Sequence, residues 1–277
     1  MNLVSALRAH RVELFFFVVL LGVVYHAIVL DMILDWKKDD NYSHGFLVPF
    51  IAGYLVYMRK DEFLAAEVRP VGAGLGLIGF GLVMLWLGWL ATEYFTMRSS
   101  MVVILAGSVL YLLGWRVFKI LLAPLTYLLL MVPIPYIVYD AAAFPLKLFV
   151  TKASVLSMKA LGIVVWQEGN ILMFPNITLE VADACSGLRS IMSLLALGAA
   201  YAFVLHSKTR DRVILIFSTL PIAVFTNCLR VIATGILAQY FGSAAAEGFF
   251  HEFAGLFVFG AAVAMFVALG SVLKRWS

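Results

Sequence analysis

Long apolar stretches alternate with short polar segments along most of this chain. A membrane-spanning helix needs about 20 mostly apolar residues, and stretches approaching that length recur with few charges inside them. The pattern therefore predicts an all-α, polytopic membrane protein with about eight transmembrane helices. The predicted spans are 14–34, 44–58, 73–91, 99–115, 118–139, 187–205, 213–237 and 251–273.

Composition supports a membrane class and leaves little room for anything else. Of the 277 residues, 64% are hydrophobic and 13% are charged, whereas about a quarter of the residues of a soluble domain are charged. We therefore expect one transmembrane domain over residues 1–277, without a separate soluble catalytic domain. Arg8 and Arg11 precede the first apolar stretch and no small-residue cleavage pattern follows it, which favours a first span over a signal peptide.

The basic residues predict the orientation of the spans. With the N-terminal arginines inside, every basic cluster between spans falls on the cytoplasmic side, as the positive-inside rule requires. These clusters are Arg8 and Arg11; Arg59, Lys60 and Arg69; Arg116 and Lys119; Lys208, Arg210 and Arg212; Lys274 and Arg275. We expect a multi-pass protein of the bacterial inner membrane with both termini cytoplasmic. The basic residues expected at the cytoplasmic ends of inserted helices also explain the net charge of +4. The sequence has no long basic run of the kind that indicates nucleic-acid binding.

Residues 141–166 do not fit the simple span pattern, because they carry Lys147, Lys152 and Lys159. We interpret them as an outward-facing amphipathic helix on the outer leaflet, with Pro133, Pro135 and Pro145 breaking the path. If this segment spanned the bilayer instead, the residues after it would change sides. From Gln167 to Ala184, turn residues separate short β-type runs, which predicts a short hairpin.

Cys185 is the strongest candidate for chemistry. It follows that hairpin at the predicted N-terminus of the helix near 187, where the helix dipole favours a thiolate. Asp183, Ser186 and Gly187 make its surroundings polar and open, and Arg189 ends the same polar run as a supporting candidate. A disulfide to Cys228 is the structural alternative, since the outer compartment is oxidising.

Arg230 and Asn227 form a second polar feature inside a predicted span. An arginine there is costly and usually faces an interior cavity, although an anchor at the membrane boundary is the simpler alternative. Asn227 lies three residues earlier and shares the same helical face, whereas Cys228 lies about 200° away from Arg230. Two polar groups on one stripe favour a site.

His251 begins the last predicted span on the same side as Cys185. An imidazole can accept a thiol proton and protonate a leaving amine near neutral pH, and Glu247 could orient the ring. His44 also falls on the outer side and is a candidate contact to substrate. The scattered histidines show no metal-binding spacing, so neither a metal nor another cofactor is expected.

Three blocks of this sequence resemble the exosortases and their archaeal relatives, the archaeosortases. They are Glu168-Gly-Asn-Ile through Val181-Ala-Asp-Ala-Cys-Ser-Gly-Leu-Arg189, then Asn227-Cys-Leu-Arg-Val231, then His251-Glu-Phe-Ala-Gly255. Tyr42-Ser-His-Gly45 and Pro133-Ile-Pro135 also resemble family patterns. The resemblance implies Cys185, Arg230 and His251 as the catalytic residues of a membrane cysteine protease or transpeptidase.

The resemblance also implies the partners. These are exported proteins with a C-terminal signal of a short Pro-Glu-Pro-type motif, a transmembrane helix and a basic tail, cleaved at the outer face and passed to a lipid or glycan acceptor. The family is associated with exopolysaccharide production. Two other classes remain open from the residues alone. A transporter or lipid-binding protein would use Arg230 and Asn227 to bind an anionic group without Cys185, and a structural scaffold would need none of the three.

Overall fold

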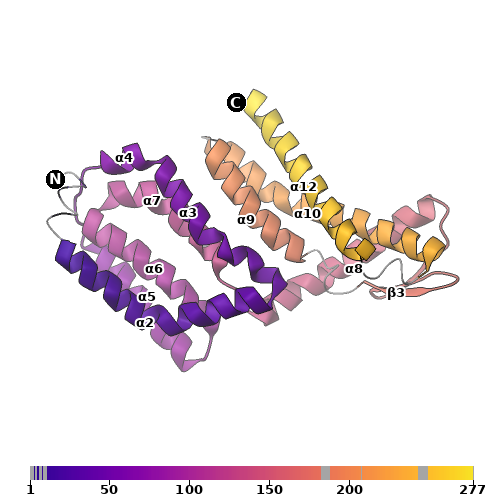
Figure 1. The fold of residues 1–277 in the computed structure, drawn as a ribbon, viewed down its shortest axis with the longest axis horizontal. Helices are drawn as coiled ribbons and strands as arrows, with labels where there is room; N and C mark the ends of the chain where they lie inside the picture. Colours follow the sequence, from indigo (N-terminus) through magenta and orange to yellow (C-terminus); the bar gives the residue numbers. More distant parts are fainter. Residues whose placement is uncertain are drawn as a thin grey trace. The chain divides into compact units, whose positions relative to one another are not determined.

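The computed structural model describes residues 3, 5, 8, 11–181, 188–206, 208–242 and 249–276; for 188–190 and 249–254 it describes the helix and not the side chains. Within these ranges the chain is almost entirely helical (Figure 1). It divides into two compact units, Met1–Pro135 and Tyr136–Ser277. The all-α class expected from the hydropathy pattern is confirmed.

The first unit contains seven described helices and one short 3-10 turn. In order they are α2 (Arg11–Lys38), the 3-10 helix η1 (Asp40–Phe46), α3 (Val48–Met58), α4 (Lys60–Leu64), α5 (Ala73–Leu90), α6 (Tyr94–Leu113), α7 (Trp115–Leu128) and the turn η2 (Leu129–Met131). The Glu93 carboxylate caps α6 by accepting hydrogen bonds from the backbone N–H groups of Phe95 and Thr96. Such caps satisfy donors that the helix itself leaves open.

The close pairing of α5 with α6 depends on glycine. A Cβ atom at Gly88 would lie 2.9 Å from the Met97 backbone nitrogen, and one at Gly107 would lie 2.8 Å from that of Ile78. Small residues allow helices in membranes to approach closely, and these positions do so here. A Cβ atom at Gly76 or Gly79 on α5 would instead point into open space, so these two positions do not require glycine for packing.

The second unit is built around one long helix. Its elements are α8 (Tyr136–Ala160), β1 (Trp166–Glu168), β2 (Ile171–Met173), β3 (Thr178–Glu180), α9 (Leu188–Leu205), α10 (Thr209–Phe241) and α12 (Phe249–Trp276). α10 packs against α8, α9 and α12, and the strands form an antiparallel sheet in the order β1-β2-β3. Gly169, with φ +60°, lies in the turn between β1 and β2. The hairpin expected between Gln167 and Ala184 is thus confirmed, with a third strand added.

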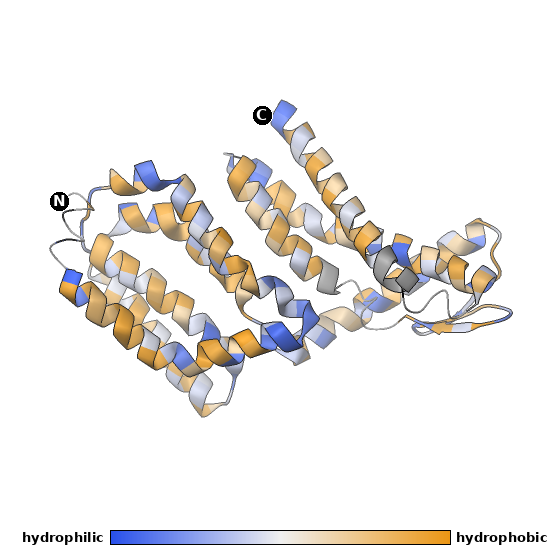
Figure 2. Cartoon of the chain, in the orientation of Figure 1, coloured by the Kyte–Doolittle hydropathy of each residue, from blue (hydrophilic) through white to orange (hydrophobic). Residues whose placement is uncertain are grey.

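Six of the described helices are long and apolar enough to cross a membrane. They are α2, α5, α6, α8, α10 and the Gly255–Trp276 part of α12. Figure 2 shows hydrophobic residues along these helices and hydrophilic ones concentrated toward helix ends and connections. The chain is therefore a multi-pass membrane protein.

The helices differ from the sequence prediction in four places. The 44–58 window divides into η1 and α3, and the 118–139 window ends at η2, because Pro133 and Pro135 interrupt the path before α8. Pro145 was expected to break the next segment and instead lies inside α8. Neighbouring groups in a membrane protein can satisfy the carbonyl that a proline leaves open, so the helix continues. The first helix continues beyond the end of the predicted 14–34 span, because α2 extends to Lys38.

Candidate functional site

Arg230 and Asn227 are both buried on α10. Their exposed fractions are 9% and 2%, whereas Leu229 between them is exposed. Thr226, also buried, donates its hydroxyl hydrogen to the carbonyl oxygens of Ile222 and Ala223 one turn earlier. A serine or threonine hydroxyl that bonds back to its own helix needs no outside partner. The buried face of α10 therefore carries three neighbouring polar side chains, Thr226, Asn227 and Arg230.

Immediately beyond Arg230, the same helix packs on apolar residues of α8 and the sheet. Val231 belongs to a buried cluster with Met158, Leu172 and Phe174. A Cβ atom at Gly235 would lie 3.0 Å from Phe174 Cζ and 3.2 Å from Met158 Sδ, so the backbone of α10 approaches its neighbours closely there. This packing fixes α10 against α8 and the sheet beside Arg230.

The segment that leads toward Cys185 is anchored in that cluster. Val181 is buried, belongs to the same cluster as Val231, and donates its backbone N–H to the Asn170 carbonyl over 2.9 Å. The Asn170 side-chain amide donates to Glu180 Oε1 at 3.0 Å and to the Val181 carbonyl at 3.3 Å. Val181, which precedes residues 182–187, is therefore held in the cluster that contains Val231, the neighbour of Arg230.

Several candidate residues lie outside what the structure describes. Asp183, Cys185, Ser186, Gly187 and Glu247 are not among the described residues. For Arg189 in α9 and His251 in α12, only the helix is described. The expected meeting of Cys185, Arg230 and His251 thus stays a prediction.

Cys228 is described and carries a free thiol. It is half-buried and packs against the apolar cluster of Val231 rather than joining Asn227 and Arg230 in full burial. Ser154 of α8 lies beside it, with its hydroxyl oxygen 3.4 Å from the Cys228 carbonyl oxygen. The helical angle that separates Cys228 from Arg230 in the sequence agrees with these different environments.

His44 lies in the first unit, on η1, among contacts that join two segments far apart in sequence. One ring nitrogen, Nε2, is 3.2 Å from the Leu130 carbonyl oxygen. Burial lowers the pKa of His44, although hydrogen bonding to the backbone of Leu130 and Asn41 opposes that effect. The imidazole is therefore held toward its neutral form.

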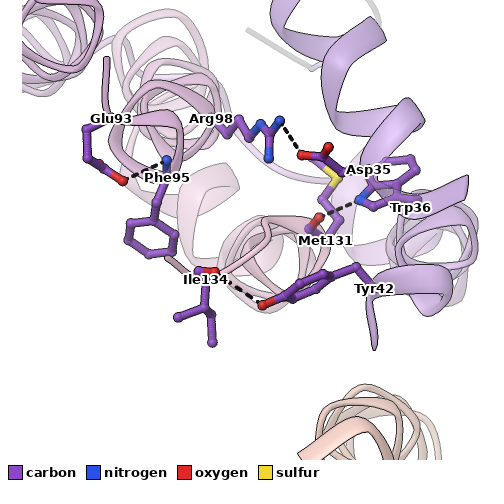
Figure 3. Close-up of polar contacts among 8 residues, drawn as sticks. All are labelled: Asp35, Trp36, Tyr42, Glu93, Phe95, Arg98, Met131 and Ile134. Atoms are coloured by element: carbon purple, nitrogen blue, oxygen red, sulfur yellow. Dashed lines mark hydrogen bonds and ion pairs between the residues drawn. The ribbon is translucent and has the colours of Figure 1, made fainter. Parts of the chain in front are cut away.

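Two neighbours of His44 make the same kind of contact (Figure 3). The Trp36 indole N–H donates to the Met131 carbonyl over 2.8 Å, and the Tyr42 hydroxyl donates to the Ile134 carbonyl over 3.2 Å. A Cβ atom at Gly45 would lie 2.5 Å from Trp36 Nε1, so this close approach requires glycine. The Tyr42–Gly45 and Pro133–Pro135 segments are far apart in sequence, and the hydrogen bond from Tyr42 to Ile134 joins them.

Sequence reasoning missed a buried ion pair in the same unit. Arg98 of α6 is 4% exposed and pairs with the half-exposed Asp35 of α2, with Nη2 and Oδ2 2.6 Å apart (Figure 3). The Arg98 guanidinium also lies over the Tyr94 ring, 5.4 Å from its centroid. Arg98 directly precedes the 99–115 window and Asp35 was assigned to a loop, so the hydropathy pattern carried no signal for this pair.

The described residues contain no group of three or more His, Cys, Asp or Glu side chains able to hold a metal ion.

Comparison with known proteins identifies the family of this chain. A sequence model described as transmembrane exosortase (Exosortase_EpsH) matches residues 36–268, a span that includes Cys185, Arg230 and His251. No curated protein matches the chain. No solved structure matches it either.

Proposed function

The chain belongs to the transmembrane exosortase family of membrane-embedded sorting transpeptidases, and from this premise we propose that it is a cysteine protease or transpeptidase acting on exported proteins. Its substrates would carry a C-terminal signal made of a Pro-Glu-Pro-type motif, a transmembrane helix and a basic tail. Cleavage would occur at the periplasmic face of the inner membrane, in a cell that couples such sorting to exopolysaccharide production.

One observation carries the assignment of the site. Val181, four residues before Cys185, is packed in the same cluster as Val231, the direct neighbour of Arg230. Four residues span at most about 14 Å of extended chain, so covalent geometry alone keeps Cys185 within that distance of Val181. A thiol close to a buried arginine would supply the parts that an activated cysteine nucleophile needs.

The chemistry would proceed in two acyl transfers. The Cys185 thiolate attacks the scissile carbonyl carbon, a C–S bond forms, and the C–N bond to the leaving amine breaks as His251 supplies its proton. Arg230 stabilises the negative charge that develops on the carbonyl oxygen. An acceptor amine on a lipid or glycan, or a water molecule, then attacks the thioester, gives its proton to His251 and releases the thiolate.

The decisive variant is Cys185→Ala, with Cys228→Ala as the matched control. We expect C185A to leave uncut precursor in the membrane, with the processing rate lowered by roughly 10⁴-fold or more, as for other covalent nucleophiles. C228A should process normally, because Cys228 packs against the apolar cluster of Val231. Immunoblotting of the precursor in cells measures both. Normal processing by C185A would contradict the proposal and favour a transporter or lipid-binding protein.

A further inference from the structure

The exposed face of α8 combines lysines with large apolar residues. Phe149, Lys152, Leu156 and Lys159 follow at helical spacing and lie within one arc of the helix, about 80° wide. Phe149 and Leu156 are 60% and 71% exposed, and both lysines are exposed. The opposite face, with Val150, Val155 and Met158, is buried in the cluster that also contains Val231. The exposed arc is therefore available to the surroundings of the protein.

The chemistry of this arc conflicts with a position in the bilayer centre. α8 is long enough to span, but its apolar window is the least hydropathic of the six candidate spans. Lys152 lies four residues from the helix midpoint, roughly 6 Å along the axis. A lysine facing lipid at that depth is strongly disfavoured, and it cannot reach the boundary as a lysine near a helix end can.

The residues after α8 have the character of a membrane interface. Trp166, at the start of β1, is 66% exposed, and Lys159 Nζ lies 5.5 Å from the centroid of its ring. Tryptophan concentrates at the level of lipid headgroups, and lysine places its apolar stem in lipid and its ammonium group among the phosphates. Within the described part of the chain, neither Lys152 nor Lys159 forms an ion pair with a carboxylate.

We propose that Lys152, Lys159 and Trp166 form a binding site for the phosphate of an anionic lipid headgroup, with Phe149 and Leu156 inserted among the acyl chains. In this arrangement α8 lies in the membrane interface and does not cross the bilayer. An acidic peptide would satisfy the lysines but would leave the exposed apolar residues of the same arc in water, which disfavours it as the occupant. The site is independent of the proposed catalysis.

The test is a titration of the purified full chain in detergent with short-chain phosphatidylglycerol. Each lysine near an anionic headgroup contributes about a factor of five to affinity, so Lys152→Gln with Lys159→Gln should raise the dissociation constant roughly 25-fold. The charge-retaining pair Lys152→Arg and Lys159→Arg should stay within about twofold of the wild type. The single glutamine variants, expected to lose about fivefold each, replace the pair if it does not fold.

Two further titrants identify the occupant. Phosphatidylcholine of the same chain length and inorganic phosphate should both bind the wild type far more weakly than phosphatidylglycerol. An unchanged dissociation constant in the glutamine variants would overturn the proposal. Equal binding of inorganic phosphate would reduce the site to one for a free anion. Glutamine variants that keep phosphatidylglycerol affinity but lose precursor processing would assign the lysines to an acidic substrate segment instead.

Discussion

Arg98 in the first unit and Arg230 in the second are almost equally buried, yet their surroundings differ. Arg98 is paired with Asp35 beside three side chains, Trp36, Tyr42 and His44, that contact backbone carbonyls of residues 130–134. Arg230 instead shares a face of α10 with Thr226 and Asn227, next to the cluster that anchors the approach to Cys185. Burial of an arginine in a membrane helix therefore does not by itself identify a catalytic site. From the neighbours of each residue we expect a structural role for Arg98 and propose a catalytic one for Arg230.

Of the variants of these two arginines, Arg230→Met should cause the largest loss of processing rate. Methionine keeps an unbranched apolar side chain in the buried position and removes the cation. Loss of a group that stabilises the oxyanion lowers the rate by about 10²–10³-fold. We expect that loss in precursor processing per folded molecule, measured with membranes of defined enzyme content.

Arg230→Lys serves as the control for charge. It keeps a cation and loses the planar, forked guanidinium, so its rate should fall between those of the wild type and R230M. A methionine variant that unfolds at a much lower temperature, with normal processing per folded molecule, would place Arg230 in the same structural class as Arg98.

The ion pair of the first unit should give the opposite result. Asp35→Asn leaves the Arg98 cation buried without its carboxylate and should cost about 3 kcal/mol of stability. Arg98→Met leaves Asp35, which is half-exposed and can be solvated, so its cost should be nearer about 1 kcal/mol. Thermal unfolding of the purified chain measures whether D35N is less stable than R98M. Both variants should process precursor normally once folded, and a specific loss of rate would remove the distinction between the two arginines.

The sequence predicted those features that depend on local pattern. Hydropathy indicated the all-α membrane class, Gly169 and Asn170 marked the turn of the hairpin, and helical spacing placed Asn227 with Arg230. It failed where distant segments decide the structure. Nothing local indicates that Asp35 pairs with Arg98 or that Tyr42 contacts Ile134, and the helix through Pro145 depends on its neighbours. Local pattern also indicated Cys185 and His251 as candidates, and the family resemblance implied that they act together with Arg230; these roles stay predictions.

The smallest effect concerns pH and again belongs to the first unit. Burial lowers the pKa of His44, so the native protein binds fewer protons than the unfolded chain between that lowered pKa and the ordinary value near 6.5. This stability is fully present above about pH 6.5 and is lost as the pH falls toward the lowered pKa. The loss should be under about 1 kcal/mol because His44 is partly exposed.

His44→Gln removes the titration and keeps an amide that can donate to the Leu130 carbonyl. The midpoint of thermal unfolding, measured from about pH 7.5 to 5.5, should therefore fall less in this variant than in the wild type. An identical slope in both proteins would assign the acid sensitivity to other groups.

The proposed mechanism requires a covalent acyl intermediate on Cys185, beside Arg230. Mass spectrometry of peptides from enzyme quenched during turnover with a precursor substrate tests it most directly. We expect a substrate-derived acyl group on the peptide containing Cys185, removed by hydroxylamine and absent from C185A. Continued processing without such an adduct, or an adduct on Cys228 instead, would contradict it.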